Sequence, residues 1–393
     1  MRNVHGTILS LVAAIVSVPA LHSQTFTVLH AFQSPEGARP MARLTGDSAG
    51  NLYGTTAYGG DYGSGTAFKL DSGDNFTVLH SFGATAEDGA QPFAPLVLGR
   101  DGNLYGTTAS GGIDCGSGDG GCGTVFQLTP SGNETVLHYF DGGEPSSSDG
   151  IHPYAGFIAL RGSNAMAGTT SAGFNGSVAY EITPAGTETV LAHQTSPNFY
   201  GSLVQDASGD LWGTTGGGHL LCEGGCGSIV RLHRTASGWI ANTTYNFTGK
   251  GDGGNPSAGL VYDGLRHVFY GVAPYGGAEG YGVLFELDST GTKLTVLHNF
   301  DFETDGAYPT QNLTIDPLGD VYGVTPGGGP DNQGTVFVYT ILGQFATLHT
   351  FTSSAGTPAG SLLLDWKKMT LYGTTFWGGD PDCQCGVIYS IRP

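Results

Sequence analysis

The sequence contains little positive charge. Lys and Arg together number 14 against 33 Asp plus Glu, which gives a formal net charge of −19 at pH 7. Proteins that bind nucleic acid or anionic membrane surfaces contact phosphate groups through clustered Lys and Arg. The composition therefore argues against a nucleic-acid partner and against electrostatic binding to a membrane surface.

Long apolar runs are almost absent. The longest runs from Ile8 to Ala20, which is shorter than the roughly 18 residues that a membrane-spanning helix requires. A basic residue precedes it and small residues follow, which is typical of a secretory signal peptide. We expect cleavage after residue 23, with 1–23 as the signal peptide and 24–393 as the mature chain. The mature chain would be extracellular or periplasmic and would have no membrane span; an N-terminal membrane anchor is the alternative.

Segments that favour long helices are also scarce. Gly accounts for 68 of the 393 residues, beside 18 Tyr and 20 Phe. Glycine-rich turns between short runs of aromatic and β-branched residues are typical of many short strands. The composition therefore favours an all-β protein.

Three phrases recur along the chain, each seven times. The first reads Leu-Tyr-Gly-Thr-Thr, with full or near-full copies starting at Leu52, Leu104, Leu211 and Leu371 and weaker copies at Ala167, Phe269 and Val321. The second resembles Gly-Thr-Val-Phe and starts at Gly65, Gly123, Gly176, Gly227, Gly282, Gly334 and Gly386. The third resembles Val-Leu-His and starts at Val28, Val78, Val136, Val190, Thr244, Val296 and Thr347. A period of about 50 residues with four strand-like runs is the size of one propeller blade. The sequence therefore predicts a seven-bladed β-propeller with four-stranded antiparallel blades.

The phase of the repeat predicts how the ring closes. Phe26 to Phe32 is an isolated copy of the fourth, outermost run, whereas Gly386 to Ile391 is a third run with no fourth after it. Pairing the two segments would remove an exposed sheet edge. We therefore expect residues 24–393 to form one monomeric domain that its first strand closes; an open array with a frayed first strand is the alternative.

The longer loops are expected on one face of the disc. Links between runs one and two, and between runs three and four, are short turns, whereas the other two kinds of link are long. In a four-stranded meander, these two long links emerge on the same face. That face is the expected binding surface, because loops on a rigid scaffold commonly carry function.

The quoted phrases resemble the GloVer tandem repeats of exported bacterial proteins, over nearly the whole mature chain. The resemblance implies a propeller-like fold and export. It supplies no activity and no catalytic residues.

A histidine recurs in the third phrase, at His30, His80, His138, His298 and His349. Strand alternation would put each on the same side as the preceding Val and the following Phe, where neighbouring blades meet. We expect structural histidines that are hydrogen-bonded between blades. One per blade would be too widely spaced for these histidines to share a metal ion.

Six cysteines interrupt the repeat. They lie in pairs within single long loops, and an exported chain favours disulfides: Cys115 with Cys122, Cys222 with Cys226, and Cys383 with Cys385. A zinc or redox site is the alternative, but no accompanying His/Cys spacing supports it. We therefore predict no metal site at these residues.

An acidic-Gly-x-x-Pro pattern recurs in the links between blades. Its acidic residues are Glu36, Asp88, Asp149, Asp252 and Asp305. A turn explains the pattern. Ca²⁺ is the one cofactor considered, although one carboxylate per blade falls short of the six to eight oxygens that the ion prefers.

Aromatic residues break the repeat in the loops between runs two and three. Tyr58, Tyr275 and Trp377 share one aligned position, and closure makes the blades of Tyr58 and Trp377 neighbours. We expect an aromatic platform for a sugar ring, with nearby carboxylates accepting hydroxyl hydrogen bonds; rings that merely cover loop backbone are the alternative. The further candidates are Tyr62, Tyr281, Phe376, Asp61, Asp380 and Asp382.

The expected function is binding rather than catalysis. The chain contains neither Gly-x-Ser-x-Gly nor His-Glu-x-x-His, so no common hydrolase motif is present. We predict a protein that binds a polysaccharide or an extracellular protein through its long-loop face. The alternative is a carbohydrate hydrolase or lyase at the channel mouth, whose candidate residues are Asp149, His152, Tyr154, His219, Glu223 and Asp305.

Overall fold

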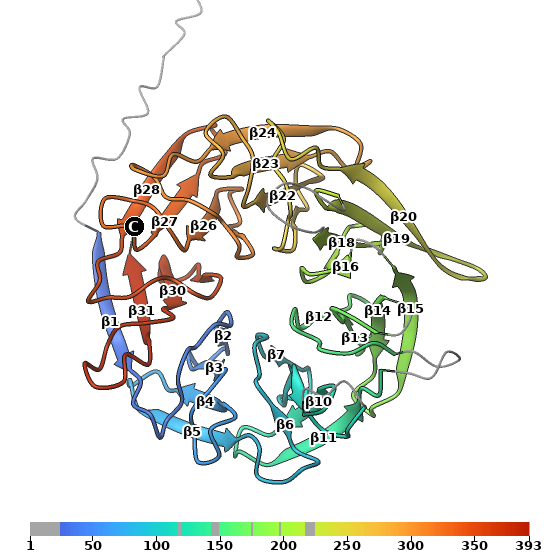
Figure 1. The fold of residues 1–393 in the computed structure, drawn as a ribbon, viewed down its shortest axis with the longest axis vertical. Helices are drawn as coiled ribbons and strands as arrows, with labels where there is room; N and C mark the ends of the chain where they lie inside the picture. Colours follow the sequence, from blue (N-terminus) through green and yellow to red (C-terminus); the bar gives the residue numbers. More distant parts are fainter. Residues whose placement is uncertain are drawn as a thin grey trace, which may run out of the picture.

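The computed structural model describes residues 24–115, 120–142, 149–173, 176–195, 198–216 and 225–392. These residues form seven β-sheets arranged in a ring around a central axis (Figure 1). The predicted seven-bladed β-propeller is confirmed. The signal-peptide prediction for residues 1–23 lies outside the described residues, and no described helix is long and apolar enough to cross a membrane.

Each blade runs from a short inner strand to a longer outer strand. Blade one contains β2 (Thr45–Gly46), β3 (Leu52–Thr56), β4 (Thr66–Leu70) and β5 (Phe76–Ser81). Blade two contains β7 (Val97–Leu98), β8 (Leu104–Thr108), β10 (Thr124–Leu128) and β11 (Glu134–Tyr139). Blade three contains β12 (Phe157–Ala159), β13 (Met166–Thr169), β14 (Ser177–Ile182) and β15 (Glu188–Gln194). Blade four contains β17 (Val204–Gln205), β18 (Leu211–Gly216), β19 (Ser228–Thr235) and β20 (Gly238–Asn246), and β16 (Asn198–Phe199) also pairs with β18.

The remaining blades follow the same order. Blade five contains β21 (Val261–Asp263), β22 (Val268–Ala273), β23 (Val283–Leu287) and β24 (Leu294–Asn299). Blade six contains β25 (Thr314–Ile315), β26 (Val321–Thr325), β27 (Thr335–Tyr339) and β28 (Phe345–Thr350). Blade seven contains β29 (Leu363–Asp365), β30 (Thr370–Thr374) and β31 (Val387–Arg392), together with β1 (Thr25–Ala31). Outside the blades, β6 (Gly89–Ala90) pairs with β9 (Ser110–Gly111).

The first strand closes the ring. β1 pairs antiparallel with β31, with Phe26 opposite Ile391 and Val28 opposite Tyr389. The two ends of the coloured chain therefore lie side by side in blade seven (Figure 1). The predicted closure is confirmed.

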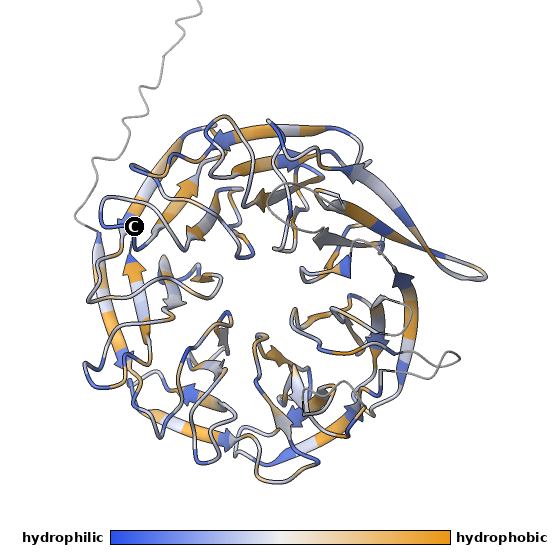
Figure 2. Ribbon diagram, in the orientation of Figure 1, coloured by the Kyte–Doolittle hydropathy of each residue, from blue (hydrophilic) through white to orange (hydrophobic). Residues whose placement is uncertain are grey.

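The glycine of Leu-Tyr-Gly-Thr-Thr makes room for the core. A Cβ on Gly54 would lie 2.5 Å from Phe68 Cζ and 2.9 Å from Leu44 Cδ2. Phe68 thus crosses its neighbouring strand at the one position that has no side chain, and it packs with Phe32 and Ile388 between blades seven and one. Similar apolar clusters lie between other neighbouring blades, and hydrophobic and hydrophilic residues alternate along the outer strands (Figure 2).

A β-bulge interrupts every outer strand inside the Val-Leu-His phrase. In blade one Val78 pairs with Phe68 and His80 pairs with Ala67, so Leu79 has no partner across the ladder. Because Ala67 and Phe68 are consecutive, Val78 and His80 point to opposite faces. The expectation that Val and His share a face is therefore wrong, since the extra residue shifts the alternation by one.

The long loops pair with one another on one face of the ring. In each blade the loop that enters the inner strand forms a short antiparallel bridge with the loop between the second and third strands, for example Ala38 with Tyr58 and Gly254 with Tyr275. β6 with β9 in blade two and β16 with β18 in blade four are the same contact in longer form. This long-loop face therefore has a backbone framework of its own.

Candidate ligand site on the long-loop face

Five loops hold the residue before their proline in a left-handed backbone conformation. These residues are Arg39, Gln91, His152, Asn255 and Tyr308, with φ between 55° and 57°. Non-glycine residues rarely adopt this region. In each case the backbone N–H donates to a carbonyl of the preceding blade, as Arg39 does to Cys385 at 2.9 Å. The backbone is thus constant, whereas the displayed side chain differs from blade to blade.

Three aromatic rings surround the side chain of Arg39. The guanidinium carbon lies 4.7 Å from the ring centre of Trp377, 4.9 Å from that of Phe376 and 5.1 Å from that of Tyr58. These distances are typical of cation–π contacts. The structure therefore brings together three of the predicted platform residues, with an arginine among them that the sequence analysis did not single out.

The rings continue toward the central axis. Tyr58 meets Phe93 at 6.2 Å between ring centres, and Phe93 meets Tyr154 at 5.4 Å. We call Phe376, Trp377, Tyr58, Phe93 and Tyr154 the aromatic arc. It runs from blade seven to the loop that enters blade three, and the side chains of Trp377 and Tyr154 are 41% and 45% exposed.

The inner end of the arc opens into a cavity of about 270 Å³ on the channel axis. All seven blades contribute residues, and Phe93, Tyr154 and Tyr200 line the side toward blades two to four. The side toward blades five to seven is polar, with Ser257, Thr310, Gln311, Asn312 and Ser361. The buried hydroxyl of Ser257 has no hydrogen-bond partner among the described residues. The cavity thus presents aromatic rings opposite hydroxyl and amide groups.

Arg43 is the one charged side chain among the described residues that line this cavity. It reaches solvent in the channel, yet protein surrounds it, and burial lowers the pKa of its guanidinium. No described carboxylate forms an ion pair with Arg43 or with Arg39. In a chain of net charge −19, the aromatic arc and the cavity thus each contain an arginine that has no described carboxylate partner.

Several predicted candidates lie apart from the arc. Tyr281 packs on Phe302 and Tyr308, and Tyr275 also packs on Tyr308, in blades five and six. Tyr62 is 56% exposed and stacks on no described ring. The single platform that was expected is thus divided between two regions of the face.

The predicted acidic candidates do not meet the rings of the arc either. Asp380 Oδ1 accepts hydrogen bonds from the backbone N–H of Asp382 and Cys383, which fixes the loop. Asp61 and Asp382 are exposed, and no described contact joins their carboxylates to the arc. The role expected for these three carboxylates, accepting hydrogen bonds beside the aromatic rings, has no support in their positions.

Two disulfides are described in the long loops, Cys115 with Cys122 and Cys383 with Cys385. Cys226 is also disulfide-bonded, whereas Cys222 lies outside the described residues. No described cysteine is free. The bond between Cys383 and Cys385 lies near the end of the loop that also carries Phe376 and Trp377.

Four of the five acidic residues in the links between blades pair with recurrent histidines, whereas Asp252 accepts a hydrogen bond from Tyr245. His138 Nε2 lies 2.9 Å from Asp149 Oδ2, and His298 Nε2 lies 2.6 Å from Asp305 Oδ2. Asp149 and Asp305 are thus occupied at the outer strands, not at the channel mouth where the alternative enzyme would need them. His219 and Glu223, two further candidates for that enzyme, lie outside the described residues.

The position directly after the loop proline lines the cavity, and of its residues the sequence analysis had singled out Tyr154 alone. It lines the channel in five blades, as Met41, Phe93, Tyr154, Ser257 and Thr310. These residues differ from one another next to a Pro that recurs in most copies, so aligning the copies would have revealed them.

Comparison with known proteins identifies one family. The model of the Gloeobacter/Verrucomicrobia repeat matches residues 6–178 and 160–389. No curated protein matches the chain in sequence.

Solved structures share the fold. Virginiamycin B lyase from Staphylococcus aureus superposes with a TM-score of 0.61 at 14% identity, over 94% of this chain and 99% of that chain. A streptogramin B lyase gives 0.59 at 15% identity, over 94% and 97%. At these identities the similarity concerns the fold alone.

Proposed function

The chain belongs to the Gloeobacter/Verrucomicrobia repeat family, and we propose that it is an exported carbohydrate-binding protein. Its ligand would lie across the aromatic arc and the mouth of the central cavity. The observation that carries the proposal is the two-sided cavity, with aromatic rings toward blades two to four and hydroxyl and amide groups toward blades five to seven. A sugar ring has apolar C–H faces and polar hydroxyl edges, so this arrangement complements it.

The two arginines favour an acidic sugar. Arg39 is held among three rings and has no carboxylate partner among the described residues, and Arg43 is the one charge among the described cavity residues. Guanidinium groups bind carboxylates through paired hydrogen bonds. A polysaccharide that contains uronic acid is therefore the expected ligand class.

Binding is favoured over hydrolysis by the chemistry of the cavity. Glycoside hydrolysis commonly uses two carboxylates on either side of the scissile bond. None of the described residues that line the cavity is Asp or Glu. The arrangement of side chains can hold a sugar chain but offers no described acid and base for cleaving it.

Glycan binding tests the proposal. The exported protein, expected to begin at Gln24, is screened against neutral and uronate polysaccharides for retention and for cleavage. Trp377→Ala and Tyr58→Ala should each weaken binding by about tenfold, on the order of 1.4 kcal/mol. Arg43→Gln should reduce the preference for uronates over neutral chains.

Trp366→Ala is the matched control. Trp366 is 36% exposed in the turn between β29 and β30, on the face opposite the long loops. Its replacement should leave binding unchanged. If Trp377→Ala and Tyr58→Ala bound every polysaccharide that the wild type retains with unchanged affinity, the aromatic arc would not be part of the binding site. If the protein bound another protein and no glycan, carbohydrate would be the wrong ligand class.

A further inference from the structure

Three of the recurrent histidines stack on an aromatic residue at the first or second position of the next outer strand. His30 stacks on Phe76 at 4.0 Å between ring centres. The same contact joins His298 to Phe345 at 3.6 Å, and His349 to Phe26 at 4.3 Å. An aromatic residue at the start of an outer strand thus covers the histidine of the preceding blade.

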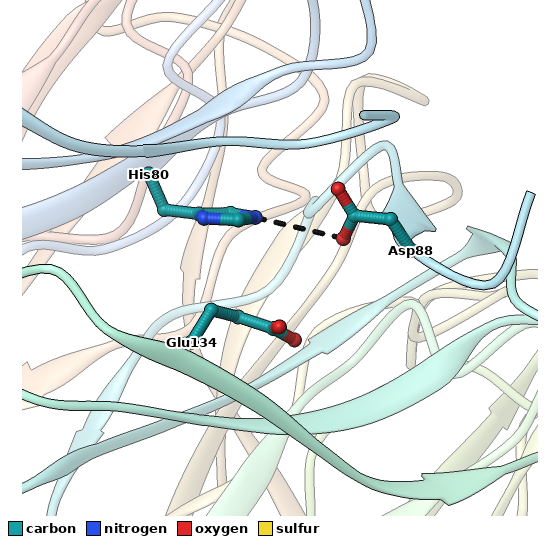
Figure 3. A group of neighbouring side chains, drawn as sticks. All are labelled: His80, Asp88 and Glu134. Atoms are coloured by element: carbon teal, nitrogen blue, oxygen red, sulfur yellow. Dashed lines mark ion pairs between the residues drawn. The ribbon is translucent and has the colours of Figure 1, made fainter. Parts of the chain in front are cut away.

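Between blades one and two a glutamate replaces this aromatic residue. Glu134 is the first residue of β11 and lies beside the ring of His80 from β5 (Figure 3). Asp88, from the loop that follows β5, completes the group. One ligand-type atom from each of the three residues lies within 4.8 Å of the other two.

The histidine and the acidic residue at this interface lie farther apart than the equivalent pairs at other interfaces. His80 Nε2 lies 3.5 Å from Asp88 Oδ1, whereas the pairs formed by His30, His138 and His298 are 2.9, 2.9 and 2.6 Å apart. His80 Nε2, Asp88 Oδ1 and Glu134 Oε1 are all buried and have no hydrogen-bond partner among the described residues. Burying three such atoms without hydrogen bonds is costly unless a further group interacts with them, and a bound cation would contact all three.

The backbone fixes Asp88 so that its Oδ1 atom faces His80 and Glu134. Its side chain is only 7% exposed. Its other oxygen, Oδ2, accepts hydrogen bonds from the backbone N–H of Gly83 at 2.9 Å and of Ala84 at 3.0 Å. The loop therefore orients Oδ1 toward His80 and Glu134 independently of either residue.

We propose that His80, Asp88 and Glu134 bind a divalent transition metal ion, with Zn²⁺ as the best match. One imidazole nitrogen with two carboxylate oxygens suits Zn²⁺, whereas Ca²⁺ prefers a shell of oxygens alone. Two ligands at about 2.0–2.1 Å from a tetrahedral ion lie roughly 3.4 Å apart, close to the distance between His80 and Asp88. Water would supply the fourth ligand.

The ion would join two blades, because β5 and β11 belong to neighbouring sheets. This site is built on outer strands and an inter-blade loop, and none of its three residues lines the central cavity. The result of the metal-binding test therefore does not depend on whether the protein binds carbohydrate.

Titration of the metal-free protein with ZnCl₂ tests the site, by calorimetry and by thermal unfolding. We expect one saturable site and a higher unfolding temperature on binding. Glu134→Gln should weaken binding by at least about tenfold, as expected for loss of a ligand. Glu134→Phe restores the residue type found at Phe76 and Phe345, so it should fold, stack on His80 and lose the site.

Glu188→Gln is the matched control. Glu188 occupies the same position at the next interface, where His138 and Asp149 are already paired at 2.9 Å. This variant should bind Zn²⁺ as the wild type does. Absence of saturable binding, equal affinity in Glu134→Gln, or preference for Ca²⁺ over Zn²⁺ would each overturn the proposal.

Discussion

The residues before the loop prolines combine a strained backbone with variable chemistry. A non-glycine residue at positive φ costs on the order of 1–3 kcal/mol and persists only where surrounding contacts hold it. Here the hydrogen bond to the preceding blade and the packing of the proline supply those contacts: a Cβ on Gly386 would lie 2.7 Å from Pro40 Cδ. Arg39 can therefore be directed at Trp377 while Gln91 and Asn255 occupy the same position elsewhere. The ring can vary its ligand groups without changing its loops.

Single acidic residues between blades also carry a pH dependence. Glu188 lies among Asp149, Asp141, His138 and the buried Tyr180. Burial raises the pKa of Glu188 from 4.5 to about 7; His138 opposes the rise and the two aspartates add to it. Between pH 4.5 and about 7 the folded protein therefore holds a proton that the unfolded chain has released. Because the folded state binds more protons in this window, stability falls as the pH rises through it.

Replacement of Glu188 by glutamine should remove this dependence. The full shift corresponds to about 3.4 kcal/mol, but the carboxyl is partly exposed and solvent screening reduces this to roughly 1 kcal/mol. Relative to Glu188→Gln, the wild-type free energy of unfolding should fall by about that amount between pH 4.5 and about pH 8. Urea unfolding at several pH values measures it. Glu279→Gln, on an exposed loop, is the control; equal pH profiles for wild type and Glu188→Gln would contradict the expectation.

At the scale of strands, the space between neighbouring strands of a blade decides which side chains a position can hold. Gly54 in β3 lies against Phe68 of β4 and Leu44, both fully buried. Its backbone is ordinary extended strand, so the requirement is for space and not for an unusual φ. A methyl group there must displace Phe68 from the contact between blades seven and one.

Gly54→Ala should therefore destabilise the protein by about 1–3 kcal/mol, the usual cost of overpacking a filled core. A lower midpoint in urea unfolding would measure this. Gly251→Ala provides the comparison, because a Cβ there has no heavy atom within 4 Å. Similar midpoints for both variants would mean that the blade relaxes around the added methyl group.

Strand order, blade number and closure could be predicted from sequence, because each depends only on the period and phase of a repeat. The face of His80 could not be predicted, because the bulge at Leu79 inserts a residue without any local signal such as glycine. The proximity of Tyr58 and Trp377 followed from closure, whereas Tyr275 had no such constraint and packs on Tyr308 instead.

The group at His80 was missed for a different reason. Its residues come from two blades, and each had a plausible structural role when considered alone. The available signal was the break in the repeat, because Glu134 stands where Phe76 and Phe345 stand in other copies. Aligning the repeats position by position, rather than motif by motif, would have identified it.

At the scale of the whole molecule, stability depends on a complete ring. Each blade buries its faces against two neighbours, and blade seven owes its outer strand to the start of the chain. Phe26 packs against His349, Phe351 and Tyr389, which joins blade six to blade seven. Without β1, the edge of β31 and the apolar surface of blade six would be exposed together, which favours aggregation.

A chain lacking residues 24–33 should therefore aggregate or fail to fold. A peptide of these ten residues, added during refolding, should restore a soluble monomer by occupying the free edge of β31 as an added strand. Within that peptide, Phe26→Ala should weaken rescue because its ring fills the contact with Tyr389. Thr27→Ala should not, since Thr27 is exposed. Light scattering and circular dichroism distinguish the outcomes. A truncated chain that is monomeric and stable without peptide would show that β1 is dispensable, and rescue by a scrambled peptide would show that its register with β31 contributes nothing.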